Sequence, residues 1–272
     1  MPNAEDRHRF RPGSKIDLHE VATSAPRNED KEDAERELAE LKERLFDLQE
    51  RLYAERTRSL LLVFQGLDGS GKNSATNHVF SGVNPEGVHV TAFKVPTAEE
   101  LAHDYLWRIH RAVPGKGQIG IFNRSHYEDV LVVRVDEIVP PEVWRERYEQ
   151  INQFEKLLAD TGTTILKFYL HLSKEEQKKR FESRIEKPEK RWKFSLDDLR
   201  KRAQWDAYLK AYDDVLERCS TDWAPWYVIP ADDKWYRNLA VARVIVAALE
   251  ELDPRFPEPA EPPGGWDHLV VE

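Results

Sequence analysis

Cysteine is almost absent from the sequence, which contains only Cys219 in 272 residues. An internal disulfide is therefore excluded, and no group of Cys and His residues has the spacing of a zinc site. Long apolar runs are missing as well, since no segment approaches the roughly 20 apolar residues that a membrane-spanning helix needs. The N-terminus also lacks the basic flank and apolar segment of a secretion signal. We therefore predict a cytoplasmic protein without a membrane-embedded part.

An excess of positive charge is lacking too, because 50 Asp and Glu outnumber 41 Lys and Arg and give a net charge of −9. Only a broadly positive surface would hold nucleic acid nonspecifically, so we predict no nucleic-acid partner. Any other polyanion must bind a local basic patch. The content of 40% hydrophobic residues and eight tryptophans suffices for a buried core, and the length allows one large domain or two small ones.

One short stretch carries the clearest functional signal. Residues 66–72 (GLDGSGK) follow an apolar run at 60–64 and precede a helix-compatible segment at 74–80. The glycines let backbone N–H groups turn around a phosphate, the helix presents its positive end, and Lys72 reaches the outer phosphates. This order favours a phosphate-binding loop over a Gly-rich turn that binds nothing. Asn73 departs from the pattern, because a Ser or Thr that helps to hold Mg²⁺ usually stands there.

Apolar strands and helical segments alternate along the chain. Strands are predicted at residues 59–65, 88–93, 118–122, 163–170 and 226–229. Helices are predicted at 31–56, from Thr97, from Ser125 through Val130, at 142–158, from Ser173, at 195–218 and at 234–252. This alternation implies right-handed crossovers and an α/β fold with a parallel sheet covered on both faces. The strands do not alternate with polar residues, as expected for strands buried on both sides.

The composition divides the chain into four segments. Residues 1–30 are polar and aperiodic and predict a flexible arm that could dock through a few apolar side chains. Residues 31–57 have leucines three or four residues apart and predict an amphipathic helix. Residues 58–252 form one domain, and 253–272 are a proline-rich, irregular tail. The leucine face of the helix is either a coiled-coil or dimer seam or a face lying on its own domain, and the sequence leaves both open.

Polar residues should gather beyond the carboxyl ends of the parallel strands, where ligands bind. Asp68 lies within the phosphate loop, and a carboxylate among phosphates is repelled unless a metal ion mediates, so it is a candidate Mg²⁺ ligand or a base. A solvated turn aspartate is the alternative. Asn123 stands where a second metal-binding carboxylate is expected, which shifts that role to Glu128 or Asp129. Arg124 suits either a bidentate phosphate contact or a helix cap.

A basic stretch at residues 178–193 contrasts with the acidic chain, with eight Lys and Arg against three Glu. Such a run is either a solvated helix face or a contact for a polyanion. Its combination with a phosphate loop favours the second interpretation, because arginines gathered around a transferred phosphoryl group stabilise its charge. Lys187 and Pro188 indicate a mobile lid whose closure would exclude water.

Six motifs, in order, resemble the polyphosphate kinase 2 family. They are residues 66–72 (GLDGSGK), 93–97 (FKVPT), 104–110 (DYLWRIH), 123–130 (NRSHYEDV), 187–193 (KPEKRWK) and 223–227 (WAPWY). The similarity runs from about residue 60 to residue 249. It implies a thymidylate-kinase-like P-loop kinase fold with three α/β/α layers, a helical lid at about 180–200 and the N-terminal helix as an extension. It also implies reversible, Mg²⁺-dependent phosphoryl transfer between inorganic polyphosphate and nucleotides, with Mn²⁺ as the alternative metal, and a homodimer or homotetramer.

The resemblance implies roles for individual residues. Asp68 helps to bind the metal and activates the acceptor phosphate, and Asp198 resembles the family's acidic residue near the lid. Arg124 and Arg184 stabilise the transferred group. The implied nucleotide and phosphate contacts are Gly66, Gly69, Gly71, Lys72, Lys94, Arg108, Lys187, Trp192 and Lys193. The implied metal ligands are Asp68, Asn123 and Glu128.

Two positions bear on activity and substrate. Asn123 with Glu128 looks like the subgroup that accepts nucleoside monophosphates as well as diphosphates, and adenine nucleotides are expected, with guanine as the alternative base. Residues 73–74 are Asn-Ser where relatives commonly have Asp-Gly, which puts the loop geometry in doubt. Two alternatives stay open, namely an ATP-dependent nucleoside monophosphate kinase and a P-loop protein that binds nucleotide without catalysis. The sequence leaves open the direction of transfer, the acceptor, the base preference and the oligomeric state.

Overall fold

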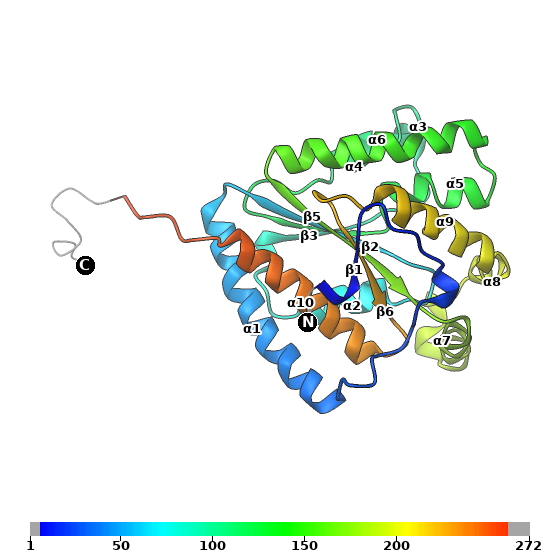
Figure 1. Cartoon of the computed structure of the whole chain (residues 1–272), viewed down its shortest axis with the longest axis horizontal. Helices are drawn as coiled ribbons and strands as arrows, with labels where there is room; N and C mark the ends of the chain where they lie inside the picture. The colour runs from blue at the N-terminus through cyan, green and yellow to red at the C-terminus, as the bar shows by residue number, and fades with distance from the viewer. Residues whose placement is uncertain (1–5, 261–272) are drawn as a thin grey trace.

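The computed structural model describes residues 6–260 and shows a six-stranded sheet between two layers of helices (Figure 1). The strands are β1 (Arg9–Phe10), β2 (Ser59–Gln65), β3 (Val88–Ala92), β4 (Ile119–Asn123), β5 (Thr163–His171) and β6 (Trp226–Pro230). Their order is β1-β6-β5-β2-β4-β3, with β1 antiparallel to β6 and all other pairs parallel. The predicted α/β fold with a parallel sheet is therefore confirmed, and each predicted strand boundary lies within one residue of the observed one.

Ten α-helices occur among the described residues. They are α1 (Lys31–Glu55), α2 (Lys72–Val79), α3 (Ala98–Leu101), α4 (Trp107–His110), α5 (Val132–Val135), α6 (Pro141–Asp160), α7 (Lys174–Glu186), α8 (Leu196–Ala203), α9 (Trp205–Cys219) and α10 (Lys234–Leu252). Short 3₁₀ turns are η1 (Asp6–His8), η2 (Leu18–Glu20), η3 (Pro85–Gly87), η4 (His126–Asp129) and η5 (Pro188–Lys193). No helix in this part of the chain is both long and apolar enough to cross a membrane.

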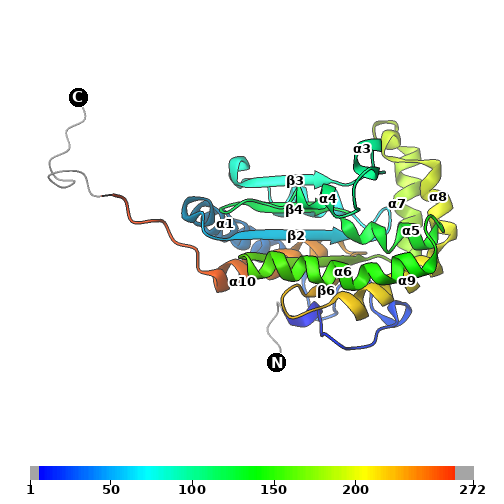
Figure 2. The ribbon, with the colours of Figure 1, turned by 90° about the horizontal axis from the view of Figure 1, so that it is seen from above.

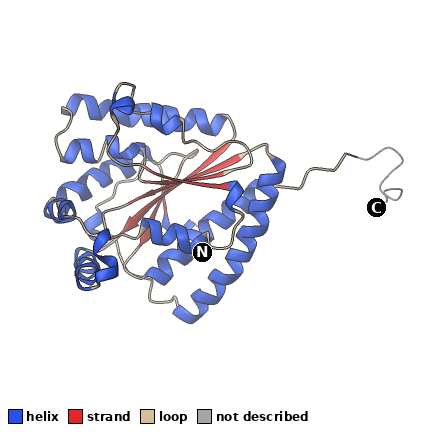
Figure 3. Cartoon of the chain, turned by 180° about the vertical axis from the view of Figure 1, so that it is seen from behind, coloured by secondary structure: helices blue, strands red, loops and turns tan. Residues whose placement is uncertain are grey.

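Successive side chains of the sheet enter two separate cores. Leu60, Leu62 and Phe64 of β2 pack with α1, α2 and α10, whereas Leu61 and Val63 pack with α6 and α9. Figure 3 shows the twisted sheet between these two helical layers. Because both faces of the central strands are covered, their sequences are continuously apolar rather than alternating.

The leucine face of α1 is buried against its own domain. Leu38, Leu45, Leu48 and Leu52 belong to the same core as α10, and Leu45 and Leu52 have no exposed surface. Of the two interpretations that the sequence left open, this chain therefore uses the face for packing on its own domain. A coiled-coil seam on the same leucines would require α1 to leave that core.

The described part of the N-terminal arm, residues 6–30, is docked on the domain, as its few apolar side chains allowed. Residues 9–10 pair with β6, and Leu18 is only 1% exposed. The Leu18 N–H donates to Asp213 Oδ1 at 3.0 Å, and Thr23 Oγ1 donates to Asp232 Oδ2 at 2.7 Å. The arm is thus held along the domain by apolar burial and hydrogen bonds to distant segments. In the predicted tail, residues 254–260 form no helix or strand, and 261–272 lie outside the described residues.

Two predicted helices were wrong in extent. The helix predicted at residues 195–218 is divided at Gln204, whose ψ of 21° separates α8 from α9. This break lets α9 pack on the core while α8 points away from it, since α9 buries nine residues and α8 buries none. The segment after Ser125 is a 3₁₀ turn followed by the four-residue α5. The short α3 does begin with the expected capping box of Thr97 and Glu100.

Candidate active site

The phosphate loop links β2 to α2 at the carboxyl end of the sheet. Gly66 and Gly71 have φ angles of 144° and 96°, and a Cβ atom at Gly71 would overlap the buried Arg237 guanidinium. Arg237 Nη1 donates to the Ser70 carbonyl at 3.3 Å, and its Nη2 donates to Ser74 Oγ at 3.3 Å. The loop is therefore held in a conformation that other residues rarely adopt. The unusual Ser74 is part of that support.

Lys72 opens α2 and turns back over its own loop. Its Nζ atom donates to the Gly66 carbonyl at 2.6 Å, and the residue is 8% exposed. Burial lowers the pKa of Lys72 to about 8, although the neighbouring Asp68 charge acts in the opposite direction. Burial disfavours the charged form of Lys72 more than the nearby carboxylates stabilise it, so an anionic ligand would add to the stabilisation of the ammonium.

Asp68 faces the cations of three different elements. Burial by itself would raise the pKa of this carboxyl, but the charges of Lys72, Arg124 and Lys201 outweigh burial and hold it at about 2. Arg124 Nη2 donates to Asp68 Oδ1 at 2.6 Å, and Lys201 Nζ lies 3.7 Å from Oδ2. Asp68 is therefore an anion throughout the physiological pH range.

Arg124 reaches Asp68 from a strained turn at the end of β4. Its φ of 61° is in the left-handed region, which a non-glycine residue adopts only at a cost of about 1 kcal/mol or more. The Arg124 N–H donates to the Phe64 carbonyl at 3.0 Å, which fixes the turn to β2. The structure thus brings together Asp68 and Arg124, two of the predicted catalytic residues.

The predicted metal ligands are all oxygen donors. Asn123 ends β4 beside Phe64 of β2, just before the phosphate loop. The charge of Glu128 acts on both Arg124 and Lys72 and favours their charged forms, although burial lowers the pKa of Lys72 overall. Within residues 6–260, no three His, Cys, Asp or Glu residues are placed to hold a metal ion. A site made of Asp68, Glu128 and the Asn123 amide would still suit a hard divalent cation in its donor chemistry.

A buried polar cluster lies directly behind the Arg124 turn. Lys167 Nζ donates to Glu155 Oε2 at 2.5 Å and to the Tyr127 hydroxyl at 2.8 Å. Tyr127 donates to Glu155 Oε1 at 2.8 Å, and His126 Nε2 lies 3.0 Å from the same oxygen. All four residues are completely buried. The cluster joins η4, which follows Arg124, to β5 and α6 and so fixes the position of the turn.

We expect Glu155→Gln to lower the free energy of unfolding by about 3–5 kcal/mol, because the ammonium of Lys167 would remain buried without its anion. Urea denaturation of the parent and the variant measures the loss. Glu149→Gln, an exposed position on the same helix, is the matched control and should change the stability by less than about 0.5 kcal/mol. Equal stabilities for parent and Glu155→Gln would contradict the role of the cluster.

The predicted lid, at about residues 180–200, falls on α7, η5 and α8, and Figure 2 places α7 and α8 beyond the arrowheads of β2 and β3. Arg184 Nη1 lies 3.6 Å from Asp198 Oδ2, so two predicted catalytic residues pair across the lid. Burial and the charge of Asp68 both raise the pKa of Asp198. Lys187, Trp192 and Lys193 are exposed, and Trp192 keeps 78% of its surface accessible. The structure does not bring these three residues to the phosphate loop.

Lys94 and Arg108 lie on the β3 side of the sheet. Arg108 Nη1 donates to the Lys94 carbonyl at 2.9 Å, and its guanidinium lies 3.7 Å from Glu100 and 3.9 Å from Asp129. The buried Arg108 is therefore satisfied by protein groups, while Lys94 is exposed. Burial raises the pKa of Asp129 to about 6 despite the arginines beside it.

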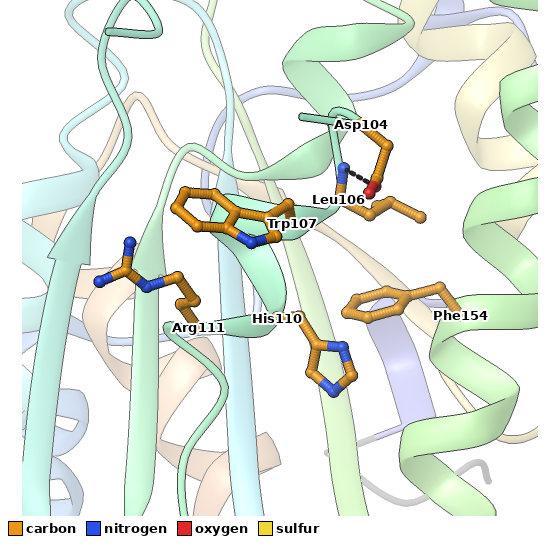
Figure 4. A pocket seen from close by; sticks show the side chains of 6 residues that line it. All are labelled: Asp104, Leu106, Trp107, His110, Arg111 and Phe154. Carbon is orange, nitrogen blue, oxygen red and sulfur yellow. Dashed lines mark hydrogen bonds between the residues drawn. The ribbon is translucent and has the colours of Figure 1, made fainter. Parts of the chain in front are cut away.

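An open cavity of about 420 Å³ lies between α4 and Phe154 of α6 (Figure 4). The rings of His110 and Phe154 lie together on one side of it, with centroids 5.5 Å apart. Arg111 lies over the Trp107 ring at 4.6 Å. None of its lining residues belongs to the phosphate loop, so the cavity is separate from the site built around Asp68.

Among the contacts of the loop that the sequence did not predict, three join it to α9, α7 and α8. The Tyr212 hydroxyl accepts from the Gly66 N–H at 3.1 Å, and Gln177 Nε2 donates to the Asp68 carbonyl at 2.6 Å. Lys201 of α8 pairs with the Asp68 carboxylate. Each contact joins residues that are far apart in the chain. Only the basic run at residues 200–202 beside a predicted lid could have pointed to Lys201.

Comparison with known proteins is consistent with this geometry. A profile of the family described as Polyphosphate kinase 2 matches residues 28–257. The AMP/ADP-polyphosphate phosphotransferase of Meiothermus ruber is 55% identical over 222 residues, which are 82% of this chain and 83% of that protein. The ADP-polyphosphate phosphotransferase of Rhodopseudomonas palustris is 46% identical over 90% of both chains. The crystal structure of polyphosphate kinase 2 from Arthrobacter aurescens TC1 superposes with a TM-score of 0.88 at 43% identity, covering 92% of this chain and 90% of that one.

Proposed function

Because the chain belongs to the polyphosphate kinase 2 family, we propose that it transfers phosphoryl groups between inorganic polyphosphate and adenine nucleotides. AMP and ADP are the proposed acceptors, and the transfer is reversible. The observation that carries this proposal is the family match over residues 28–257, which spans the phosphate loop, the Arg124 turn and the lid. The relatives named above are phosphotransferases of AMP, ADP and polyphosphate, which supports the same substrate class.

The charges of the site support a division of roles. Lys72 and the loop N–H groups bind phosphate, and Arg124 and Arg184 stabilise the negative charge of the transferred group. We assign Asp68 as a metal ligand rather than a base, because a carboxyl with a pKa of about 2 accepts a proton weakly. Asp198, whose pKa is raised, is the better candidate for a proton-accepting carboxylate near the lid.

We propose Mg²⁺ as the divalent cation, with Mn²⁺ able to replace it. Asp68, Glu128 and the Asn123 amide would hold the ion, which when bound would neutralise phosphate charge and align the reacting groups. The chain's own part is to bring the two phosphate chains together between the loop and the lid and to exclude water. Lys94, Arg108, Lys187, Trp192 and Lys193 stay proposed contacts for the nucleotide and the polyphosphate.

We also propose a cytoplasmic setting for this chain. The single, fully buried Cys219 and the acidic net charge are compatible with the cytoplasm. A homodimer or homotetramer remains our expectation, with guanine nucleotides as secondary substrates. Since the leucine face of α1 is buried within the chain, another surface would have to form that interface.

The deciding experiment supplies the purified chain with long-chain polyphosphate and Mg²⁺, using AMP and ADP as separate acceptors. We expect ADP and ATP from AMP, and ATP from ADP. An assay with ATP and AMP but no polyphosphate distinguishes the alternative, an ATP-dependent nucleoside monophosphate kinase. Absence of product from polyphosphate with either acceptor would overturn the proposal.

A further inference from the structure

Helix α8 of the lid carries three successive basic residues, each bound to a different element. Arg200 forms two hydrogen bonds of 2.9 Å with the carboxylate of Asp136, which follows α5. Lys201 lies 3.7 Å from Asp68 in the phosphate loop. Arg202 donates to the Lys174 carbonyl of α7 at 2.6 Å. Consecutive residues point in different directions around a helix, so α8 contacts the phosphate loop, the segment after α5 and α7 at the same time.

Lys201 lies between two carboxylates. Its Nζ atom is 3.7 Å from Asp68 Oδ2 and 3.3 Å from Asp197 Oδ2 of its own helix. The Lys201 side chain is only 16% exposed, so this contact lies inside the protein surface rather than in bulk water. The positive charge of Lys201 also contributes to the low pKa of Asp68.

The two oxygens of Asp68 are held unequally. Oδ1 accepts a hydrogen bond of 2.6 Å from Arg124, whereas the 3.7 Å contact of Oδ2 with Lys201 is longer than a hydrogen bond. A second cation can therefore bind Oδ2 more easily than Oδ1. An ammonium and a divalent cation at this oxygen would repel each other, because like charges a few ångströms apart destabilise one another strongly.

We propose that Lys201 and a divalent cation bind Asp68 Oδ2 in alternation, so that the lid supplies the counterion of Asp68 until the metal arrives. The inference rests on the proposed function, because it takes Asp68 as a metal ligand. Asp197 retains Lys201 after the exchange, so the displaced ammonium is not left unpaired. Lys201 is thus a positioning residue that couples the lid to the metal state of the phosphate loop.

The test measures the affinity of the full chain for Mn²⁺, without nucleotide or polyphosphate, by electron paramagnetic resonance of the free ion. Lys201→Met removes the competing charge, and we expect it to bind Mn²⁺ about tenfold more tightly than the parent. Lys201→Arg keeps the charge and should bind Mn²⁺ as the parent does. Asp68→Asn should abolish the gain in the Lys201→Met background.

Lys210→Met is the matched control. Lys210 also lies near two carboxylates, Asp213 at 4.0 Å and Asp214 at 3.6 Å, but on α9 and in no ion pair with Asp68. Lys210→Met lowers the net charge by one unit, as Lys201→Met does, and should leave the Mn²⁺ affinity unchanged. Hydrogen exchange provides a second measurement, since Mn²⁺ should speed exchange in the α8 peptide of the parent but not in that of Lys201→Met.

Unchanged or weaker Mn²⁺ binding in Lys201→Met overturns the inference, as does an equal gain in Lys210→Met. A gain that persists in the Asp68→Asn background overturns it as well, because the ion would then bind elsewhere. None of these measurements requires turnover. Failure of the polyphosphate assay therefore overturns the proposed reaction without deciding the cation exchange, and the two outcomes remain distinguishable.

Discussion

Lys72→Met should lower kcat/KM for polyphosphate and AMP by about 10²–10³-fold while leaving the protein at least as stable as the parent. The activity falls because the ammonium that reaches the outer phosphates is removed. The stability is retained because burial lowers the pKa of Lys72, so the fold itself disfavours the charged form. Steady-state kinetics and urea denaturation of the same preparations measure both effects.

The control is Lys72→Arg, which keeps the positive charge and should retain part of the phosphate affinity. A protein that only binds nucleotide would show no turnover in the parent, so loss of measurable turnover in Lys72→Met also argues against that alternative. The outcome that would sink the assignment is a Lys72→Met enzyme with near-parental kcat/KM. Equal losses of activity and stability would instead indicate general unfolding.

The same lysine predicts a pH dependence. Its pKa of about 8 in the folded chain lies below the usual value near 10.5, so the ammonium is lost as the pH rises through 8. Affinity for tripolyphosphate, measured without metal, should therefore fall above about pH 8 in the parent. In Lys72→Met the weaker residual affinity should show no such fall. The free energy of unfolding should rise over the same range, because the folded chain loses its buried charge between pH 8 and 10.5 while the unfolded chain keeps it.

The sequence predicted β2, β4, β5 and β6 well because these strands are buried on both faces and therefore appear as largely apolar runs. The edge strand β3 is partly exposed and was predicted from its β-branched residues. It also placed Asp68 and Arg124 beyond the carboxyl ends of two strands, and the structure pairs them at 2.6 Å. No local feature of the sequence predicts the order of the strands in the sheet. The strand β1 was missed because its two residues are too few to show an alternating pattern. The arm was assigned as flexible because its partners, such as Asp213, come from the far end of the chain.

The helices in the region of the predicted lid were harder to predict for a related reason. The pattern at residues 195–218 is helical throughout, and only tertiary packing decides that α8 and α9 separate at Gln204. That separation is what turns Lys201 toward Asp68 rather than toward solvent. Basic residues on one predicted helix could therefore not be divided into solvated and functional ones until the partner element was known.

Asp68→Asn should reduce kcat by about 10²–10³-fold and weaken Mn²⁺ binding, because an amide is a poorer ligand and no longer balances Lys72, Arg124 and Lys201. Asp68→Glu keeps the charge but displaces it by one methylene, so it should recover stability more fully than activity. A kcat within threefold of the parent in Asp68→Asn would exclude Asp68 from the metal site. Isothermal titration with Mn²⁺ and single-turnover kinetics supply the two measurements.

The stability at acid pH tests the interaction of the Asp68 charge with its three cations separately from catalysis. The pKa of Asp68 is about 2 in the folded chain, against about 3.9 unfolded, so its charge stabilises the fold above pH 3.9 by about 2–3 kcal/mol. This contribution is lost as the pH falls from about 4 to 2. The difference in unfolding free energy between parent and Asp68→Asn should therefore be largest near pH 7 and shrink below pH 4. A difference that stays constant with pH would mean that the three cations do not depend on the Asp68 charge.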